Sequence, residues 1–226
     1  MYLLHDMPDS CSLIIRLVMD EAGLPCQVAP VDAEARRTDS DGYRAITPTG
    51  LIPALETPQG VVFETGAILL WLCDRHGLGP SEAAPARTTL LKWLFFVSNT
   101  LHADLRQLFY PESYVPKAAQ DGHHALITAR VKRHFALVDA AVADAPGLFA
   151  PGGLLAPYLA FLIRWSVLYA SGPQPWFMLS DYPALALMAH TLEARPATQR
   201  LMAAEGLGTT PFTAPRPATA PVAAAT

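Results

Sequence analysis

The first candidate for chemistry is a cysteine that comes directly before a predicted helix. Cys11 lies in the stretch PDSCSL, and the apolar residues that follow it indicate a helix over 12–22. A thiol at a helix N-terminus lies beside unpaired amide groups, which favour its thiolate, lower its pKa and make it reactive. The alternative is an inert buried thiol. That interpretation is preferred for Cys26, which precedes a strand, and for Cys73, which lies in an apolar helix.

A carboxylate and a hydroxyl occupy the start of another predicted helix. Glu64 and Thr65 stand between the strand-like stretch VVF and the helical stretch AILLWL. The free amide groups of a helix N-terminus favour anionic groups, so this turn is suited to binding a charged ligand. The same geometry would also suit Thr65 as an ordinary helix N-cap.

A third feature is a proline at the start of an apolar strand. In ITPTGLIPAL, Pro53 follows Leu51 and Ile52 in a run otherwise suited to burial. Proline has no amide proton to donate to a sheet, so its position there needs a reason. One explanation is that Pro48, Gly50 and Pro53 only shape a loop.

A histidine lies on the polar side of a long predicted helix. His102 is flanked by Ser98 and Arg106, each one turn away, and the three form a polar line beside a stripe of leucines. A lone histidine is usually an ordinary surface or core residue. A histidine beside a reacting group can instead hydrogen-bond that group or act as a general base near neutral pH.

Composition places the chain among globular proteins. Apolar residues make up 51% and charged residues 16% of the chain, which excludes disorder for most of it. A net charge of −4 without basic clusters argues against nucleic acid as the main partner. The three cysteines lack the spacing of a zinc site and fit a reducing compartment. The N-terminus has no pattern of a signal peptide.

The periodicity predicts an α/β unit followed by an all-α unit. Residues 1–77 alternate strand and helix patterns in the order β-α-β-α-β-β-α, which indicates a mixed sheet with helices on its faces. A proline-rich linker over 78–86 leads to residues 87–208, where only helical patterns occur. Residues 209–226 are rich in Pro, Ala and Thr and are predicted to be a disordered tail. The apolar span 145–180 is interrupted by proline and glycine, so we expect a buried core helix there rather than a membrane span.

Residues 4–77 resemble the N-terminal, thioredoxin-like domain of cytosolic glutathione transferases. The motifs that carry the resemblance are PDSCSL, TPTGLIPAL and FETGAILLWLCDRHG. The later stretches LLKWLFFVSNTLHADLR, PYLAFLIRWS and ARPATQRLMAAEGL resemble the helical-bundle domain of the same family. The CSL context and the LH dipeptide of the long helix are most similar to the bacterial beta class.

The resemblance implies a site for glutathione as co-substrate, and no metal. Pro53 is similar to a family proline with a cis peptide bond, which turns the Ile52 backbone toward the cysteinyl residue of glutathione, as an added strand would pair. Glu64 and Thr65 would hold the γ-glutamyl end. Arg36 matches a lysine of the class that reaches the glycyl carboxylate, although a solvated loop charge is an equal alternative. The expected glutathione-binding residues are therefore Arg36, Leu51, Ile52, Pro53, Glu64 and Thr65.

The resemblance also implies catalytic residues. The class has a cysteine at the position of Cys11, and at the position of His102 a histidine that faces the glutathione sulfur. A class tyrosine near the end of the first strand corresponds to Asp6 here, which leaves Cys11 and Ser12 as candidates for activating the thiol. A class asparagine is replaced by Phe95, which changes the polar network around the histidine. The pocket for a hydrophobic second substrate would be lined by Phe109, Tyr110 and Trp165, although aromatics at helical spacing more often form core.

The activity expected from the resemblance is glutathione S-transfer, in which the activated thiol attacks an electrophilic small molecule. Thiol-disulfide exchange through Cys11 is a close variant, and an isomerase would need only a different second pocket. The alternative is a non-catalytic binding or regulatory protein, because a fold does not determine function. We further expect a cytoplasmic homodimer, with the small domain of one subunit against the helical domain of the other, and no partner membrane or nucleic acid.

Overall fold

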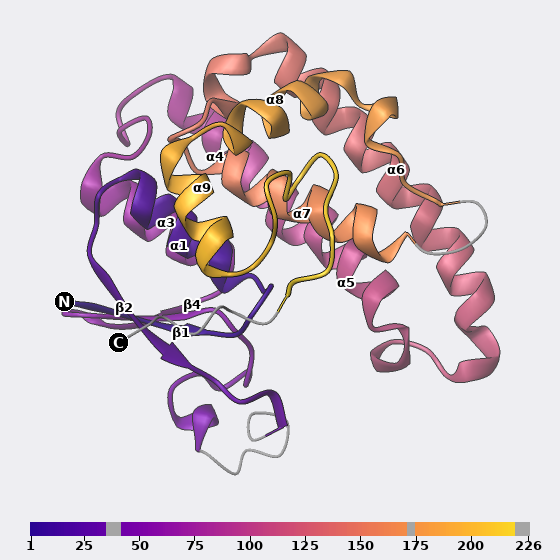
Figure 1. Ribbon diagram of the computed structural model, residues 1–226, viewed down its shortest axis with the longest axis horizontal. Coiled ribbons are helices and arrows are strands. Elements are labelled where there is room, and N and C mark those ends of the chain that lie inside the picture. The colour runs from indigo at the N-terminus through magenta and orange to yellow at the C-terminus, as the bar shows by residue number, and fades with distance from the viewer. Residues whose placement is uncertain (35–41, 171–174, 220–226) are drawn as a thin grey trace.

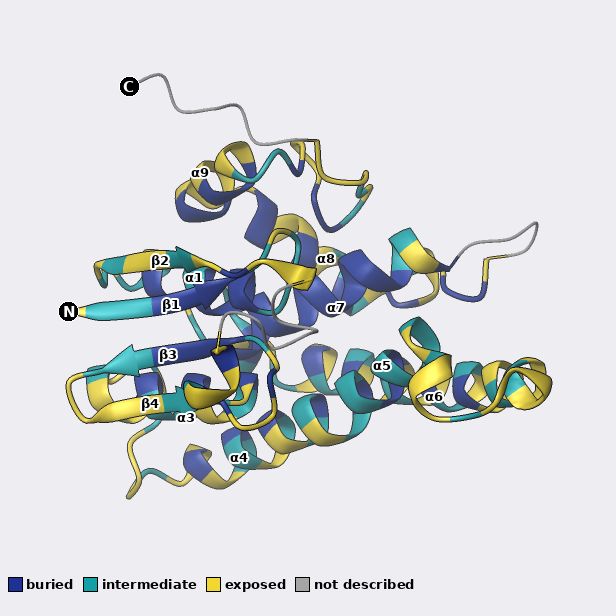
Figure 2. Cartoon of the chain, turned by 90° about the horizontal axis from the view of Figure 1, so that it is seen from below, coloured by how far each residue is buried: buried dark blue, intermediate teal, exposed yellow. Residues whose placement is uncertain are grey.

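The computed structural model describes residues 1–34, 42–170 and 175–219. Its N-terminal half contains a four-stranded sheet in the order β2-β1-β3-β4, seen edge-on in Figure 1 and from another side in Figure 2. β2 is parallel to β1, whereas β3 is antiparallel to both of its neighbours. The elements of this half are β1 (Tyr2–Asp6), α1 (Ser12–Glu21), β2 (Cys26–Pro30), β3 (Ala54–Thr57), β4 (Gly60–Phe63) and α3 (Thr65–His76).

Helices α1 and α3 lie on the same face of the sheet (Figure 1) and contact each other. Their apolar residues are buried there, including Ile14 and Leu17 of α1 and Leu69 and Leu72 of α3. Gly77 ends α3 in the left-handed region, with a φ of 65°, which residues with a Cβ rarely adopt. The predicted order of the four strands and of the first and last helices is confirmed, whereas the helix predicted between β2 and β3 falls largely on residues 35–41, outside the described residues.

The C-terminal half is helical, as predicted. It comprises α4 (Ala86–Phe96), a π-helix (Val97–His102), α5 (Ala103–Phe109), α6 (Gln120–Asp144), α7 (Leu155–Tyr169), α8 (Pro183–Glu193) and α9 (Pro196–Ala204), joined in part by short 3-10 turns. The predicted leucine stripe runs along α4, the π-helix and α5. Its buried members are Leu90, Leu94, Val97, Leu101 and Leu105.

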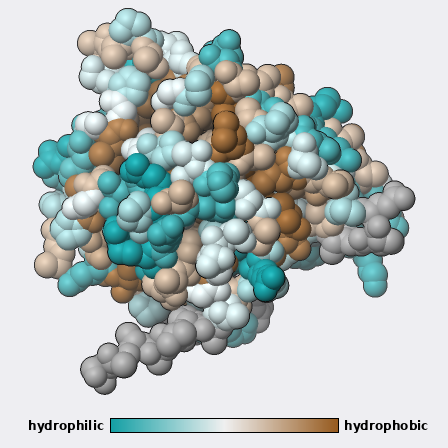
Figure 3. All heavy atoms as spheres, turned by 45° about the horizontal axis from the view of Figure 1, so that its top comes forward, coloured by the Kyte–Doolittle hydropathy of each residue, from teal (hydrophilic) through white to brown (hydrophobic). Residues whose placement is uncertain are grey.

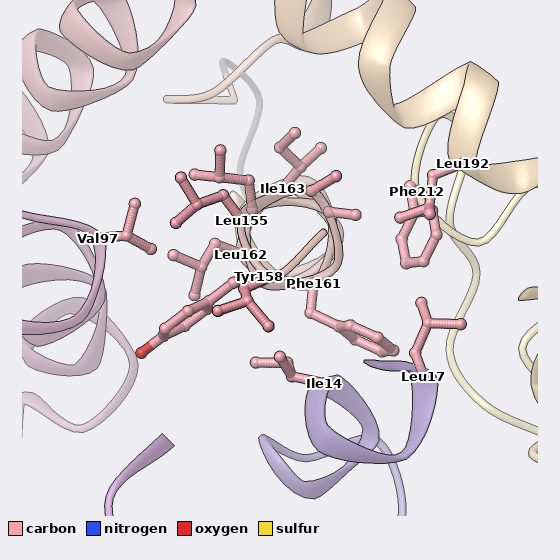
Figure 4. Packing of buried hydrophobic residues seen from close by; sticks show 14 of the residues in the cluster. Ile14, Leu17, Val97, Leu155, Tyr158, Phe161, Leu162, Ile163, Leu192 and Phe212 are labelled. Carbon is pink, nitrogen blue, oxygen red and sulfur yellow. The ribbon is translucent and has the colours of Figure 1, made fainter. Parts of the chain in front are cut away.

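Helix α7 lies at the centre of the core. Residues 155–166 are all buried, and most of the helix is dark blue in Figure 2. Figure 4 shows Phe161 of α7 beside Ile14 and Leu17 of α1. A single hydrophobic cluster includes residues of α1, α3 and α7, so the two halves of the chain share one core. The expectation of a buried core helix in this apolar span is confirmed.

Residues 209–219 differ from the disordered tail that composition suggests. Phe212 is fully buried and packs edge-on against Phe161, with ring centroids 5.3 Å apart. The carboxylate of Glu193 accepts hydrogen bonds from the backbone amides of Phe212 and Thr213, at 2.7 and 2.8 Å. The Phe212 ring and the Glu193 carboxylate therefore help to hold this segment against the helical core, which its Pro, Ala and Thr content did not predict. Residues 220–226 lie outside the described part of the chain.

Large apolar side chains are also exposed on the surface. The most exposed along the helices are Leu187 (67%), Leu126 (60%) and Tyr169 (55%). On the face shown in Figure 3, hydrophobic residues form several separate groups among hydrophilic ones. Among the described residues, no helix has both the length and the apolar character needed to cross a membrane.

Candidate active site

A cleft with a volume of about 1390 Å³ is lined by residues of both halves of the chain. One wall consists of the loop before α1, the segment before β3 and the start of α3; the other consists of the π-helix, α5 and α7. The predicted site residues that line the cleft are Cys11, Leu51, Ile52, Pro53, Glu64, Thr65, His102, Phe109, Tyr110 and Trp165. Arg36 lies outside the described residues.

The Ile52–Pro53 peptide bond is cis, as the resemblance implied. β3 begins at Ala54, so Leu51, Ile52 and Pro53 precede the strand and line the cleft. The carbonyl oxygen of Leu51 accepts a hydrogen bond of 3.4 Å from the hydroxyl of Tyr43. The segment therefore forms a rim along which an extended ligand can lie.

Glu64 adopts an unusual backbone conformation at the start of α3. Its φ is 72° and its ψ is 123°, in a region that costs a non-glycine residue about 1–3 kcal/mol and that is common at ligand sites. Glu64, not Thr65, holds the N-cap position, and no side chain caps the helix. The interpretation of Thr65 as an ordinary N-cap is therefore wrong. Thr65 is the first residue of α3 and lines the cleft with Glu64.

A chain of three polar side chains joins the two walls of the cleft. Nε2 of His102 lies 3.6 Å from Sγ of Cys11, and Nδ1 of His102 lies 2.9 Å from the hydroxyl of Tyr158. Figure 4 shows the Tyr158 hydroxyl directed away from the surrounding apolar side chains. His102 is the last residue of the π-helix, an irregularity that is frequent at functional sites.

Burial makes all three of these groups neutral near pH 7. It raises the pKa of the Cys11 thiol to about 12 and raises the pKa of Tyr158 well above its usual value. Burial, assisted by the positive charge of Arg106, lowers the pKa of His102 to about 4. The expectations of a lowered cysteine pKa and of a histidine titrating near neutral pH are therefore wrong. Desolvation outweighs the effect of the helix N-terminus and of neighbouring charges.

Ser12 faces away from the cleft. It is fully buried, its hydroxyl donates a hydrogen bond to the carboxylate of Asp6, and it lies 2.8 Å from the hydroxyl of Ser10. Asp6 occupies the position at which the beta class has a tyrosine, and here it contacts Ser12 instead of the cleft. This arrangement argues against Ser12 as a group that acts on a bound thiol.

An ion pair that spans the fold holds the loop before Cys11. The guanidinium group of Arg164, which is fully buried, donates two hydrogen bonds of 2.7 and 2.8 Å to the carboxylate of Asp9. The indole nitrogen of Trp165 donates a third, at 3.1 Å. Arg164 also donates to the carbonyl oxygens of Pro211 and Arg216, at 3.2 and 3.0 Å. The C-terminal segment is thus connected to the cleft.

The aromatic end of the cleft contains more residues than the sequence indicated. The rings of Phe109 and Tyr169 lie 5.1 Å apart, and those of His102 and Trp165 lie 6.0 Å apart. The guanidinium carbon of Arg106 lies 5.4 Å from the centre of the Tyr110 ring. The residues that sequence reasoning did not assign to the cleft include Asp9, Arg44, Arg106, Tyr158 and Tyr169. For Asp9 the one available signal was the lone charge of Arg164 in an apolar span, which requires a counter-ion.

No cluster of His, Cys, Asp and Glu suited to hold a metal ion occurs among the residues that the structure describes. The cysteines are free, and Cys73 is buried in the core.

Comparison with known proteins assigns the family. Residues 4–81 match the family model for the N-terminal domain of glutathione S-transferases. These residues are therefore a glutathione S-transferase N-terminal domain. It is 28% identical to the glutathione S-transferase GST-4.5 of Xanthomonas campestris over 210 residues, which covers 90% of this chain and 98% of that protein.

Solved structures of the transferase family share the fold over most of the chain. A sphingomonad glutathione S-transferase complexed with glutathione is 27% identical, with a TM-score of 0.74 over 91% of this chain and 100% of that one. The beta-class enzyme of Sphingomonas chungbukensis, at 24% identity, has a TM-score of 0.73 over 90% of this chain and 98% of that one. The predicted family and the predicted two-part fold are confirmed.

Proposed function

We propose that the protein is a glutathione S-transferase whose thiol-activating centre is the pair Cys11 and His102. The observation that carries the proposal is the 3.6 Å contact between these side chains in a cleft that both halves of the fold line. The arrangement favours an enzyme over a non-catalytic binding protein, because the polar side chains of Cys11, His102 and Tyr158 lie next to an apolar pocket large enough for a second substrate.

Glutathione would lie along the wall formed by the N-terminal half. The backbone of Ile52 would pair with the cysteinyl residue, and Glu64 and Thr65 would hold the ammonium and carboxylate of the γ-glutamyl end. Arg44 lines the cleft near Gly50 and is a second candidate, beside Arg36, for the glycyl carboxylate. A guanidinium group can bind a carboxylate bidentately.

The neutral state of the catalytic residues suggests how they act. Tyr158 remains protonated, and when its hydroxyl donates to Nδ1 of His102, the histidine proton lies on Nε2. The Cys11 thiol and the His102 Nε2–H group are then two donors that can hydrogen-bond a glutathione thiolate. The thiol proton leaves to water, and the thiolate lone pair forms the new C–S bond to the electrophile.

The raised pKa of Cys11 favours conjugation over disulfide exchange. A thiol with a pKa of about 12 forms little thiolate near neutral pH, and the thiolate is the species that attacks a disulfide. Cys11→Ser retains a hydrogen-bond donor, whereas Cys11→Ala removes it. We expect conjugation to survive better in the serine variant than in the alanine variant. Equal loss in both, together with glutathione-dependent disulfide reduction by the wild type, would favour exchange.

The remaining assignments follow from the same proposal. Phe109, Tyr110 and Trp165 would contact a hydrophobic electrophile. A cytoplasmic homodimer is proposed on the likeness to the family, and Phe95, which is 51% exposed on α4, is a candidate contact between subunits. Sedimentation of wild type and Phe95→Glu tests this assembly, because a buried charge would weaken a dimer that uses this surface.

Thermal unfolding with and without reduced glutathione tests the proposed function. A ligand at 100 times its dissociation constant stabilises the fold by about 2.7 kcal/mol. We expect a clear upward shift in Tm for the wild type, a much smaller shift for Glu64→Ala, and an unchanged shift for Glu82→Ala, an exposed glutamate in the linker. The absence of a shift at millimolar glutathione would contradict the proposal.

A further inference from the structure

An arginine lies in the cleft one helical turn beyond the proposed catalytic histidine. Arg106 of α5 lines the cleft together with His102, Phe109 and Tyr110. Its guanidinium group lies over the Tyr110 ring, 5.4 Å from the ring centre. The arginine is therefore held against an aromatic surface with its hydrogen-bonding edge available to a bound molecule.

Arg106 forms no ion pair with a carboxylate in the part of the chain that the structure describes. By contrast, Arg16, Arg87, Arg164 and Arg195 each have a carboxylate partner within the fold. The positive charge of Arg106 also reaches the centre of the site, since it opposes the rise that burial causes in the pKa of Cys11 and adds to the fall that burial causes in the pKa of His102. A cation in this position favours a negatively charged ligand group.

The position of Arg106 separates it from the ends of the proposed glutathione site. The turn at Glu64 and Thr65, which would hold the γ-glutamyl end, lies close to the π-helix one turn before His102. A Cβ placed on the next residue, Gly66, would lie 3.1 Å from Oγ of Ser98. Arg106 follows His102 by one turn and is thus on the opposite side of the histidine. Around it stand Phe109, Tyr110 and Tyr169, which form the aromatic end of the cleft.

We propose that Arg106 binds an anionic group, such as a carboxylate, on an aromatic electrophile whose ring lies among Phe109, Tyr110 and Tyr169. This inference rests on the proposed function and names the class of its second substrate. An arginine among aromatic side chains matches a planar acid, because the guanidinium group pairs with the carboxylate and the rings contact the aromatic part.

Two aryl chlorides of matched reactivity test the proposal. 4-Chloro-3,5-dinitrobenzoate carries a carboxylate, and 2-chloro-1,3-dinitrobenzene, which has the same two nitro groups beside the chlorine, does not. In each case the glutathione sulfur forms a bond to the ring carbon, the C–Cl bond breaks, chloride leaves with the bonding electron pair, and the thiol proton goes to water. The variants are Arg106→Met, Arg106→Lys and, as a control of equal charge change, Arg133→Met, which is exposed on α6 and does not line the cleft.

We expect Arg106→Met to lower kcat/KM for the benzoate by about tenfold or more, mainly through KM, because a hydrogen-bonded charge pair is lost. The uncharged substrate should change by less than about threefold. Arg106→Lys should retain part of the preference for the benzoate over the uncharged substrate, and Arg133→Met should leave that preference unchanged. The preference should also weaken at high salt. Equal losses for both substrates in Arg106→Met would overturn the proposal and would indicate that the arginine acts on the sulfur.

Calorimetry with the two S-aryl glutathione conjugates gives a readout that needs no turnover. We expect the wild type to bind the carboxylated conjugate more tightly than the uncharged one, and Arg106→Met to lose that preference. A wild type without any preference would overturn the proposal. If neither chloride reacts but the preference in binding is present, the proposed transferase function fails and the anion site stands.

Discussion

Two buried polar clusters flank the loop of residues 8–11, and they differ in charge. On the cleft side, Cys11, His102 and Tyr158 contact one another as neutral groups. On the other side, Asp9 and Arg164 form a charged pair, whose side chains are 15% and 0% exposed. Each cluster contains one residue of the loop before α1 and at least one of α7, and the two loop residues, Asp9 and Cys11, are only two positions apart in the sequence.

The difference lies in the partners that each cluster contains. A buried group gives up its charge when no counter-ion compensates the loss of water. Arg164 is the counter-ion of Asp9 and donates two hydrogen bonds to its carboxylate, and Trp165 donates a third. Among the described residues, the hydrogen-bonding partners of Cys11 and His102 are neutral. The fold therefore places the ion pair of Asp9 and Arg164 beside a neutral pair, Cys11 and His102, next to which a charged ligand group can bind.

Removal of the Asp9 carboxylate should have the largest effect on the unfolding free energy. Asp9→Ala leaves the Arg164 guanidinium group buried without a counter-ion, and such a loss costs about 3–5 kcal/mol of unfolding free energy. Urea denaturation measures it. The control is Asp20→Ala, which breaks an ion pair with Arg200 whose side chains are 41% and 63% exposed and should cost about 0–1 kcal/mol. Similar costs for both variants would show that Asp9 and Arg164 do not form a coupled pair.

Truncation of Phe212 should have the next largest effect on the unfolding free energy. Phe212→Ala removes a fully buried ring beside Phe161 and should lower the unfolding free energy by about 3 kcal/mol. Because the same segment supplies carbonyl groups to Arg164, the charged cluster should loosen while the neutral one remains. Leu187→Ala, at a residue 67% exposed, is the matched surface control. A loss below about 1 kcal/mol in Phe212→Ala would mean that this segment does not anchor the arginine.

The neutral cluster should be visible in the pH dependence of stability. The pKa of His102 is 6.5 in an unfolded chain and about 4 in the fold, so the unfolded state binds the proton first as pH falls. Stability therefore decreases from pH 6.5 toward pH 4, by up to about 1.4 kcal/mol per pH unit for this group. His102→Gln should flatten the curve between pH 6.5 and pH 5. An identical slope in wild type and variant would contradict the assignment.

The smallest effect is expected for Tyr158→Phe. Loss of the hydroxyl leaves Nδ1 of His102 without its partner and should cost about 1 kcal/mol in urea denaturation. Tyr114→Phe, at a residue 45% exposed, serves as the control and should change stability little. If Tyr158→Phe is as neutral as the control, the tyrosine does not position the histidine.

The sequence predicted elements well because their signals are local. The strand and helix periods, the turn at Gly77 and the leucine stripe depend on neighbours within a few residues. The electrostatics of the site were predicted wrongly for a related reason. The helix N-terminus beside Cys11 is a local feature, but the burial that dominates its pKa depends on a cleft that residues distant in the sequence also line, such as His102 and Tyr158. The Asp9–Arg164 pair was not predicted because its members are far apart in the sequence. The burial of Phe212 was not predicted because the surrounding Pro, Ala and Thr residues are typical of a disordered segment.

The shared core also has a consequence for how the chain is made. The apolar side chains of α1, including Ile14 and Leu17, pack on α7, which begins at Leu155. On a ribosome the residues of the sheet and of α1 are therefore synthesised long before those of α7, which packs on α1. At usual rates of synthesis α7 follows α3 after roughly 5–20 s. During that interval the nascent N-terminal half exposes a surface that the finished protein buries, which makes it a natural substrate for chaperones that bind apolar segments.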